Sequence, residues 1–154
     1  MRLQVYLLDK APQQCAEMYS DEHLVPSISV LIAVLQAVDE EEHPFKKHIL
    51  TRWCGGSAEY SWVGELIEAL IAEAIFRFGV DFTKERIQVY HLMKERYTRV
   101  EPRRWLQLIP KVVQGQPVQA YQEFYCSTQQ GATWTKRGAP SWFKAPEQRA
   151  ITFN

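Results

Sequence analysis

The apolar positions of the chain recur mainly at the three- and four-residue spacing of amphipathic α-helices. Residues 57–78 show this pattern most clearly, and Gly79 follows them where a glycine commonly ends a helix. The apolar face predicted for this helix consists of Trp62, Leu66, Ile67, Leu70, Ile71, Ala74, Ile75 and Phe78. Its solvent face is predicted to carry Glu59, Glu65, Glu68 and Glu73.

Three further segments have helical patterns with recognisable ends. Residues 11–20 predict a short helix, with Pro12 in a first turn that needs no N–H at that position. Residues 27–40 are apolar almost all round, so they predict the most buried helix. A helix that begins near Asp21 would have to kink at Pro26 or start afresh there. Residues 117–126 predict a last helix that begins at Pro117.

The remaining patterns are weaker. Residues 83–97 predict a helix capped by Thr83, whose mostly inward residues are expected to be Ile87, Val89, Tyr90, Leu92 and Met93. Residues 43–56 are expected to form a connection, and residues 3–7 either a short strand or an apolar arm. Because four or five helices occur without a hairpin or βαβ alternation, we expect an all-α fold. Residues 1–154 would form one domain, with 127–154 as an extended tail packing on it.

The composition is that of an ordinary globular protein. With 154 residues, 46% of them hydrophobic, the chain can bury a core without a metal or disulfide. Its three widely spaced cysteines fit neither a disulfide framework nor a zinc knuckle, and they favour a reducing cytosol. The N-terminus lacks the features of a signal peptide, and the longest apolar stretch, 28–38, is too short for a bilayer. We therefore expect a cytoplasmic protein without a membrane partner.

Charge is segregated along the chain although its sum is zero. Residues 1–80 contain 6 Lys or Arg and 12 Asp or Glu, whereas residues 81–154 contain 12 and 6. The basic half interleaves its cations with aromatic residues, a combination that suits phosphates and stackable bases. We expect these side chains to gather on a single exposed surface that binds DNA. The alternative is a solvated charged face with the tail aromatics packed on the core.

Other candidate chemistry is weak. Asp21, His23, His43 and His48 are the residues closest to a metal set, but their spacing matches no strong metal motif, so we expect neither metal nor cofactor. Helix caps or a hydrogen-bonded core histidine are the simpler interpretation. A functional His23 would bind a phosphate or base, or transfer a proton. No phosphate-binding loop, dinucleotide fingerprint or nucleophile elbow occurs in the sequence.

Four motifs carry a resemblance to known proteins: Asp21-Glu22-His23, residues 48–53, residues 57–62 and the tail element 140–144. In this combination the chain resembles small bacteriophage proteins with a DxH and a His…Trp…Ser…Tyr/Trp pattern. More distantly, it is similar to pyrimidine-dimer DNA glycosylases of the phage endonuclease V type. That resemblance implies a compact all-α fold in the cytoplasm of an infected bacterial cell. It also implies an enzyme that kinks duplex DNA, extrudes a base and attacks the sugar with its N-terminal amine.

The resemblance assigns roles residue by residue. His23 matches the histidine that contacts DNA, Trp142 and Phe143 match the aromatic tail, and Met1 would supply the amine. Met1 and His23 are thus the candidate catalytic residues. The residues expected to bind nucleic acid are Arg2, His23, His48, Arg96, Arg99, Arg103, Arg104, Trp105, Lys136, Arg137, Trp142 and Lys144.

The chain departs from the glycosylase pattern at two positions. Val30 stands where that family has its essential glutamate, seven residues beyond the histidine, and an apolar side chain cannot shuttle a proton. Arg2 is too large to favour removal of the initiator methionine. The sequence therefore predicts a protein that acts on duplex, damaged or modified DNA and leaves open whether it excises a base.

Two other interpretations stay open. In the first, the chain is a non-enzymatic interaction module that docks on a host protein or self-associates through its acidic and basic halves. In the other it would be a hydrolase or nucleotide-modifying enzyme that uses Asp21, His23 and His48.

Overall fold

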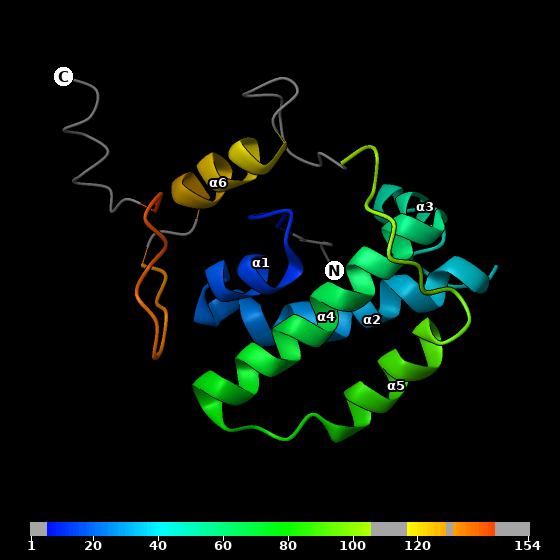
Figure 1. The fold of residues 1–154 in the computed structure, drawn as a ribbon, viewed down its shortest axis with the longest axis horizontal. Helices are drawn as coiled ribbons and strands as arrows, with labels where there is room; N and C mark the ends of the chain where they lie inside the picture. Colours follow the sequence, from blue (N-terminus) through cyan, green and yellow to red (C-terminus); the bar gives the residue numbers. More distant parts are fainter. Residues whose placement is uncertain (1–5, 106–116, 129–130, 144–154) are drawn as a thin grey trace.

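The computed structural model describes residues 6–105, 117–128 and 131–143 (Figure 1). Within these ranges the chain forms six helices and no strand, which confirms the predicted all-α class. The helices are α1 (Pro12–Met18), α2 (Asp21–Asp39), α3 (Ile49–Trp53), α4 (Ser57–Phe78), α5 (Thr83–Met93) and α6 (Pro117–Thr128).

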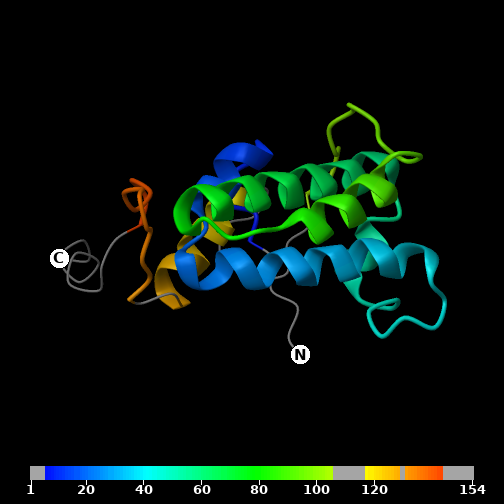
Figure 2. The same cartoon turned by 90° about the horizontal axis from the view of Figure 1, so that it is seen from below.

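Helices α2 and α4 form the centre of the fold. They run in opposite directions, because Arg77 near the end of α4 contacts Asp21 at the start of α2. Figure 2 shows α2 as one layer and α4 with α5 as the layer on top of it. Leu31 and Leu35 of α2 and Leu66 and Leu70 of α4 are fully buried, and their burial supplies much of the driving force for folding.

Helix α2 begins at Asp21 and passes through Pro26 without interruption. Of the two expectations for Pro26, the new start is therefore wrong, because α2 already begins at Asp21. A proline at this position removes one hydrogen bond to the carbonyl of Glu22, but both residues are exposed, so water can satisfy that carbonyl. The helix is long and apolar enough to cross a membrane, with a mean hydropathy of 1.3, and here it packs on α4 as core helices also do.

Helix α5 differs from its prediction at both ends and in its orientation. It ends at Met93 rather than near Tyr97, and Thr83 is its first residue rather than its cap, which is Phe82. Asp81, just before the cap, accepts a hydrogen bond from the Thr83 N–H. Ile87 and Tyr90, predicted to point mostly inward, are 53% and 63% exposed. The physical reason is that α5 lies over α2 and α4 with one narrow face, on which only Val89 and Met93 are buried.

Two smaller differences concern the segments around α4. Residues 49–53 form α3 inside the segment predicted to be a connection. Glu73, predicted on the solvent face of α4, is only 4% exposed.

The described residues after α6, 131–143, form neither helix nor strand and pack on the body through Trp134, as predicted for the tail.

The α4–α5 contact depends on a glycine. A Cβ added at Gly64 would lie 1.8 Å from Sδ of Met93, so the buried Met93 side chain fills the space that an alanine would need and would have to repack. We expect Gly64→Ala to lower the free energy of unfolding by about 1–3 kcal/mol, because overpacking outweighs the better helix propensity of alanine. Urea denaturation measures this. Gly138→Ala is the control, because nothing lies within 4 Å of its added Cβ, and an equal loss there would contradict the contact.

Candidate nucleic-acid interface

Residues 94–105 cross the molecule from the end of α5 to α3 and are fixed to both α4 and α3. The Thr98 N–H donates to Oγ of Ser61 in α4 at 2.8 Å. Nε1 of Trp53 in α3 donates to the Arg104 carbonyl oxygen at 2.9 Å. These bonds hold the cationic part of the segment over α3.

A cluster of three tryptophans supports this junction. Trp105 lies 6.2 Å from Trp53 and 5.2 Å from Trp62 between ring centroids, and Trp53 lies 6.4 Å from Trp62. Trp62 is buried, whereas Trp53 and Trp105 are only partly buried. Nζ of Lys10 lies 5.9 Å from the Trp105 ring, which is within cation–π distance.

The cations around this cluster are exposed. Arg52, Arg99, Arg103 and Arg104 have exposed side chains, and none of them forms an ion pair with a residue that the structure describes. We call the group formed by Arg52, Trp53, Arg99, Arg103, Arg104 and Trp105 the α3 surface. Unpaired guanidinium groups beside partly exposed indoles can contact phosphates and stack on bases.

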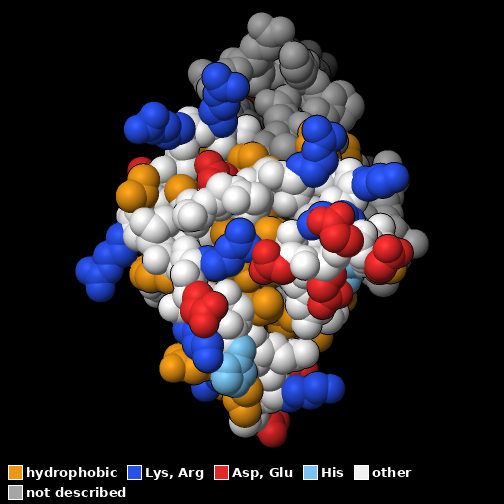
Figure 3. All heavy atoms as spheres, turned by 90° about the vertical axis from the view of Figure 1, so that its right-hand side faces the viewer, with side chains coloured by type: hydrophobic (Ala, Val, Ile, Leu, Met, Phe, Trp, Pro, Cys, Tyr) orange, Lys and Arg blue, Asp and Glu red, His pale blue; other side chains and the backbone are white. Residues whose placement is uncertain are grey.

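Arg96 is the exception within the segment. Its guanidinium contacts the Asp39 carboxylate at 3.1 Å and lies 4.7 Å from the Tyr60 ring centroid. The expected DNA contact is therefore already engaged in an ion pair. The exposed acidic run 39–42 begins at this ion pair, and Figure 3 shows acidic side chains between the Lys and Arg side chains of this face. A polyanion would have to lie on the Arg99–Arg104 side of Arg96.

His48 begins α3 rather than binding a metal. Its Nδ1 accepts a hydrogen bond from the Leu50 N–H at 3.1 Å, and Nδ1 of His43 likewise accepts from the Phe45 N–H. Both imidazoles act as caps or turn acceptors, one of the simpler interpretations that the sequence left open. His48 precedes Trp53 by one short helix, so it lies close to the α3 surface.

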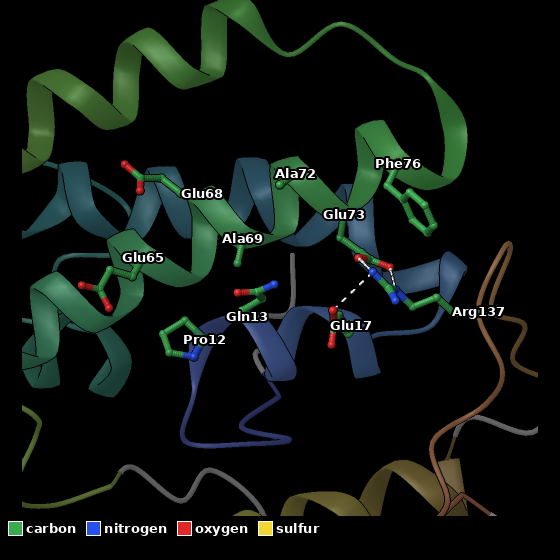
Figure 4. A pocket seen from close by; sticks show the side chains of 10 residues that line it. All are labelled: Pro12, Gln13, Glu17, Glu65, Glu68, Ala69, Ala72, Glu73, Phe76 and Arg137. Atoms are coloured by element: carbon green, nitrogen blue, oxygen red, sulfur yellow. Dashed lines mark hydrogen bonds and ion pairs between the residues drawn. The ribbon is translucent and has the colours of Figure 1, made fainter.

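The cations of the tail lie elsewhere. Arg137 bonds the Glu73 carboxylate, with 2.9 Å between Nη2 and Oε1, and contacts Glu17 at 3.3 Å. Figure 4 shows these three side chains converging at one end of the pocket between α1 and α4. Lys136 donates from Nζ to the Phe76 carbonyl oxygen at 3.0 Å. Both cations therefore hold the tail against the end of α4.

A buried ion network lies beneath Arg137. Arg77, whose side chain is fully buried, bonds Glu73 at 2.7 Å and Asp21 at 3.1 Å. Asp21 also accepts from the N–H and hydroxyl of Thr135. Although burial by itself raises the pKa of Asp21, hydrogen bonds from Thr135 and its other partners leave that pKa below its usual value. Asp21 therefore ties the tail to α2 as a carboxylate.

His23 lies in an aromatic cage near the same end. Its ring stacks on Tyr6 at 5.2 Å and meets Tyr125 edge-on at 5.8 Å. Both ring nitrogens are buried and have no hydrogen-bond partner among the residues that the structure describes. Burial lowers the pKa of His23, although the nearby Glu22 acts in the opposite direction. His23 is therefore a partly buried imidazole that favours the neutral form and whose two nitrogens are covered.

The two tail tryptophans also face inward. Trp134 is buried, and its Nε1 donates to the Met18 carbonyl oxygen at 2.9 Å. Trp142 lies 6.0 Å from Tyr125, and its buried Nε1 has no hydrogen-bond partner in the described part of the chain. The tail indoles thus pack on the body, which was the alternative to stacking on bases.

The expectation of one continuous surface is wrong. His23 is sixteen residues before Asp39 in α2, which at 1.5 Å per residue separates the two ends by about 24 Å. The group near the tail contains His23, Lys136, Arg137 and Trp142, and the other contains His48, Arg96, Arg99, Arg103, Arg104 and Trp105. Met1, Arg2 and Lys144 lie outside the described residues.

The resemblance to the glycosylases puts Val30 at the position of their glutamate. Val30 is a partly buried residue of α2. Burial raises the pKa of Cys15 and of Cys54 to about 12, so neither thiol is a nucleophile at neutral pH. Arg52 and Trp53 of the α3 surface, and Lys10 beside Trp105, were not among the contacts predicted from the sequence. The adjacent Arg52 and Trp53 carry the same signal as Arg104 and Trp105 and could have been found.

Comparisons with known proteins give no relative for this chain. No family model matches the sequence, and neither a curated protein nor a solved structure matches it significantly.

Proposed function

We propose that the protein binds DNA through the α3 surface. The observation that carries the proposal is the position of Arg103 and Arg104, which are exposed and unpaired next to partly exposed indoles. The segment that presents them is hydrogen-bonded to α3 and α4, so less entropy is lost when it meets a ligand.

The proposal is limited to binding. In the tail, Arg137 is neutralised by Glu73 and Glu17, and Lys136 bonds the Phe76 carbonyl oxygen, so these cations support attachment of the tail rather than a second contact with DNA. Base excision would require an acid to assist an attacking amine, and position 30 is a valine. Trapping of a covalent adduct with damaged DNA by borohydride would extend the proposal to lyase chemistry.

We expect binding to a duplex oligonucleotide to weaken steeply with salt. Each phosphate contact contributes about 0.9 to the slope of log K against log salt concentration. Arg104→Ala should therefore reduce the magnitude of this slope by about 0.9, the value of one contact. The double variant Arg103→Ala/Arg104→Ala should reduce it by about 1.8, the value of two contacts. Fluorescence anisotropy over a range of salt concentrations measures both slopes.

Lys136→Ala is the matched control. It also removes one cation that the sequence predicts to bind DNA. Lys136, however, lies at the end of the molecule away from the α3 surface, where its ammonium bonds the Phe76 carbonyl oxygen. The slope should not change. Affinity that is insensitive to salt, or equal effects of Lys136→Ala and Arg104→Ala, would contradict binding at the α3 surface.

A further inference from the structure

A groove with a volume of about 630 Å³ lies between α1 and the outer face of α4. Its floor is apolar and deep because Ala69 and Ala72 have small side chains. Figure 4 shows two carboxylates, those of Glu65 and Glu68, at the end opposite Arg137. We call it the α1–α4 groove, and the lining residues that matter here are Pro12, Glu65, Glu68, Ala69, Ala72 and Phe76. A hollow with an apolar floor and a few charged groups is typical of a binding site.

The tail already places a cation at one end of the groove. The Arg137 guanidinium bonds the Glu73 carboxylate and contacts Glu17 at 3.3 Å. The same guanidinium carbon lies 4.8 Å from the Phe76 ring centroid, which is within cation–π distance. This end therefore holds a basic side chain between carboxylates and an aromatic face, and it shows which chemistry the groove accommodates.

The opposite end carries negative charge that no described cation neutralises through an ion pair. Glu68 and Glu65 form none with the residues that the structure describes, and the hydrogen bond that Glu65 accepts comes from the Tyr97 hydroxyl at 2.6 Å. Burial, and then repulsion from Glu65, raise the pKa of Glu68, and attraction to Arg86 offsets this only in part. A cation bound here would relieve the repulsion, whereas a phosphate would increase it.

The free part of the groove is longer than a single small ion. Glu65 and Ala72 are seven residues apart in α4, which corresponds to about 10 Å along the helix. An extended chain covers that length with about three residues. A polypeptide segment with one basic side chain therefore matches both the length of the free part and the charge at its end.

We propose that the α1–α4 groove binds an extended segment of a partner protein through one basic side chain, preferably arginine. The charged end of this side chain contacts Glu65 and Glu68, and its methylene stem covers Ala69 and Ala72. Arginine fits better than lysine because its planar guanidinium can bond two carboxylate oxygens at once, as the guanidinium of the tail does at the other end. The inference does not depend on DNA binding, because the groove attracts cations and contains no residue of the α3 surface.

Titration of the isotope-labelled full chain with the acetylated tripeptide amide Ala-Arg-Ala tests the groove by nuclear magnetic resonance. We expect saturable binding that shifts the backbone amide signals of residues 65–76 and leaves those of the α3 surface unchanged. Citrulline in place of the peptide arginine keeps the shape without the charge and should weaken binding about tenfold. The free butylguanidinium cation should bind less tightly than the peptide, because it lacks the backbone that covers the rest of the groove.

Variants of the protein locate the contact. Glu68→Gln should weaken peptide binding about fivefold. Ala72→Leu should weaken it about tenfold, since the larger side chain fills the floor. Glu40→Gln is the matched control, because it removes the same charge at an exposed residue outside the groove and should leave the affinity unchanged. The double variant Arg103→Ala/Arg104→Ala should bind the peptide like the wild type, which separates this site from the α3 surface.

Far-ultraviolet circular dichroism verifies that each variant is folded. The proposal is overturned if the wild type does not bind the arginine peptide or if the citrulline peptide binds equally well. Equal effects of Glu68→Gln and Glu40→Gln would also overturn it, since attraction would then depend on overall charge. Butylguanidinium that binds as tightly as the peptide would exclude a polypeptide segment as the occupant.

Discussion

Glu73→Gln should lower the free energy of unfolding by about 3 kcal/mol or more. Glu73 is 4% exposed and lies between two guanidinium groups, those of Arg77 and Arg137. Glutamine has nearly the same volume but no charge, so the fully buried Arg77 would keep only Asp21 as a charged partner. Removing one member of a buried ion network is costly because the desolvated charge that remains is not compensated. Urea denaturation gives the change from the midpoint at constant m-value.

Glu68→Gln is the matched control for this variant. It is the same substitution in the same helix, but the Glu68 side chain is exposed and forms no ion pair with a described residue. Its effect should be within about 0.5 kcal/mol. Similar losses for the two variants would show that the network stabilises the fold no more than a solvated glutamate does.

The dependence on pH gives a second measure of the Glu73 network. Burial alone would raise the pKa of Glu73, but hydrogen bonds from Arg137 and Arg77 outweigh burial, so the pKa lies below its ordinary value. A carboxylate with a lowered pKa contributes stability that is present above the ordinary value of 4.5 and is lost as the pH falls through its folded-state pKa. Acid should therefore destabilise the wild type more than Glu73→Gln.

The helices could be predicted from the sequence where the helical pattern of apolar residues extends over many turns. Residues 57–78 match α4 at both ends, because the pattern runs for six turns and Gly79, with φ of 65°, ends it. Helix α3 could not be predicted, since five residues are too few to show a period. In α5, apolar residues lie on several sides, so only the contacts with α2 and α4 decide that Val89 is buried and Ile87 is not.

The candidate site was harder to predict than the fold because it depends on long-range pairing. The sequence places Arg96 and Arg137 in one basic half, but Asp39 neutralises the first and Glu73 the second, each more than fifty residues away. Arg103 and Arg104 form no ion pair with a described residue. Local charge counts cannot separate these two outcomes.

His23 is a polar residue whose presence costs stability. A neutral imidazole has one donor and one acceptor, and in His23 neither finds a partner within residues 6–105, 117–128 and 131–143. Each unsatisfied buried group costs about 1–3 kcal/mol. Proteins keep such groups mainly where they serve a function. The resemblance to DNA-contacting histidines can therefore be tested by replacing His23 in its cage of Tyr6 and Tyr125.

His23→Phe should therefore raise the free energy of unfolding by about 1–3 kcal/mol at neutral pH, because phenylalanine keeps the stacking and removes both unsatisfied nitrogens. It should also remove part of the acid sensitivity. Since burial lowers the pKa of His23, the unfolded chain binds the proton more readily, and stability is lost as the pH falls from about 6.5 through the folded-state pKa.

Thermal or urea unfolding of both proteins between neutral and mildly acidic pH measures this difference. His43 and His48 accept backbone hydrogen bonds and contribute equally to both curves, so the difference between the curves isolates His23. If His23→Phe is less stable than the wild type, or if the two curves stay parallel, the imidazole has polar partners in solution. If the variant is more stable but binds DNA more weakly, the cost of His23 is connected to binding although the ring lies far from the α3 surface.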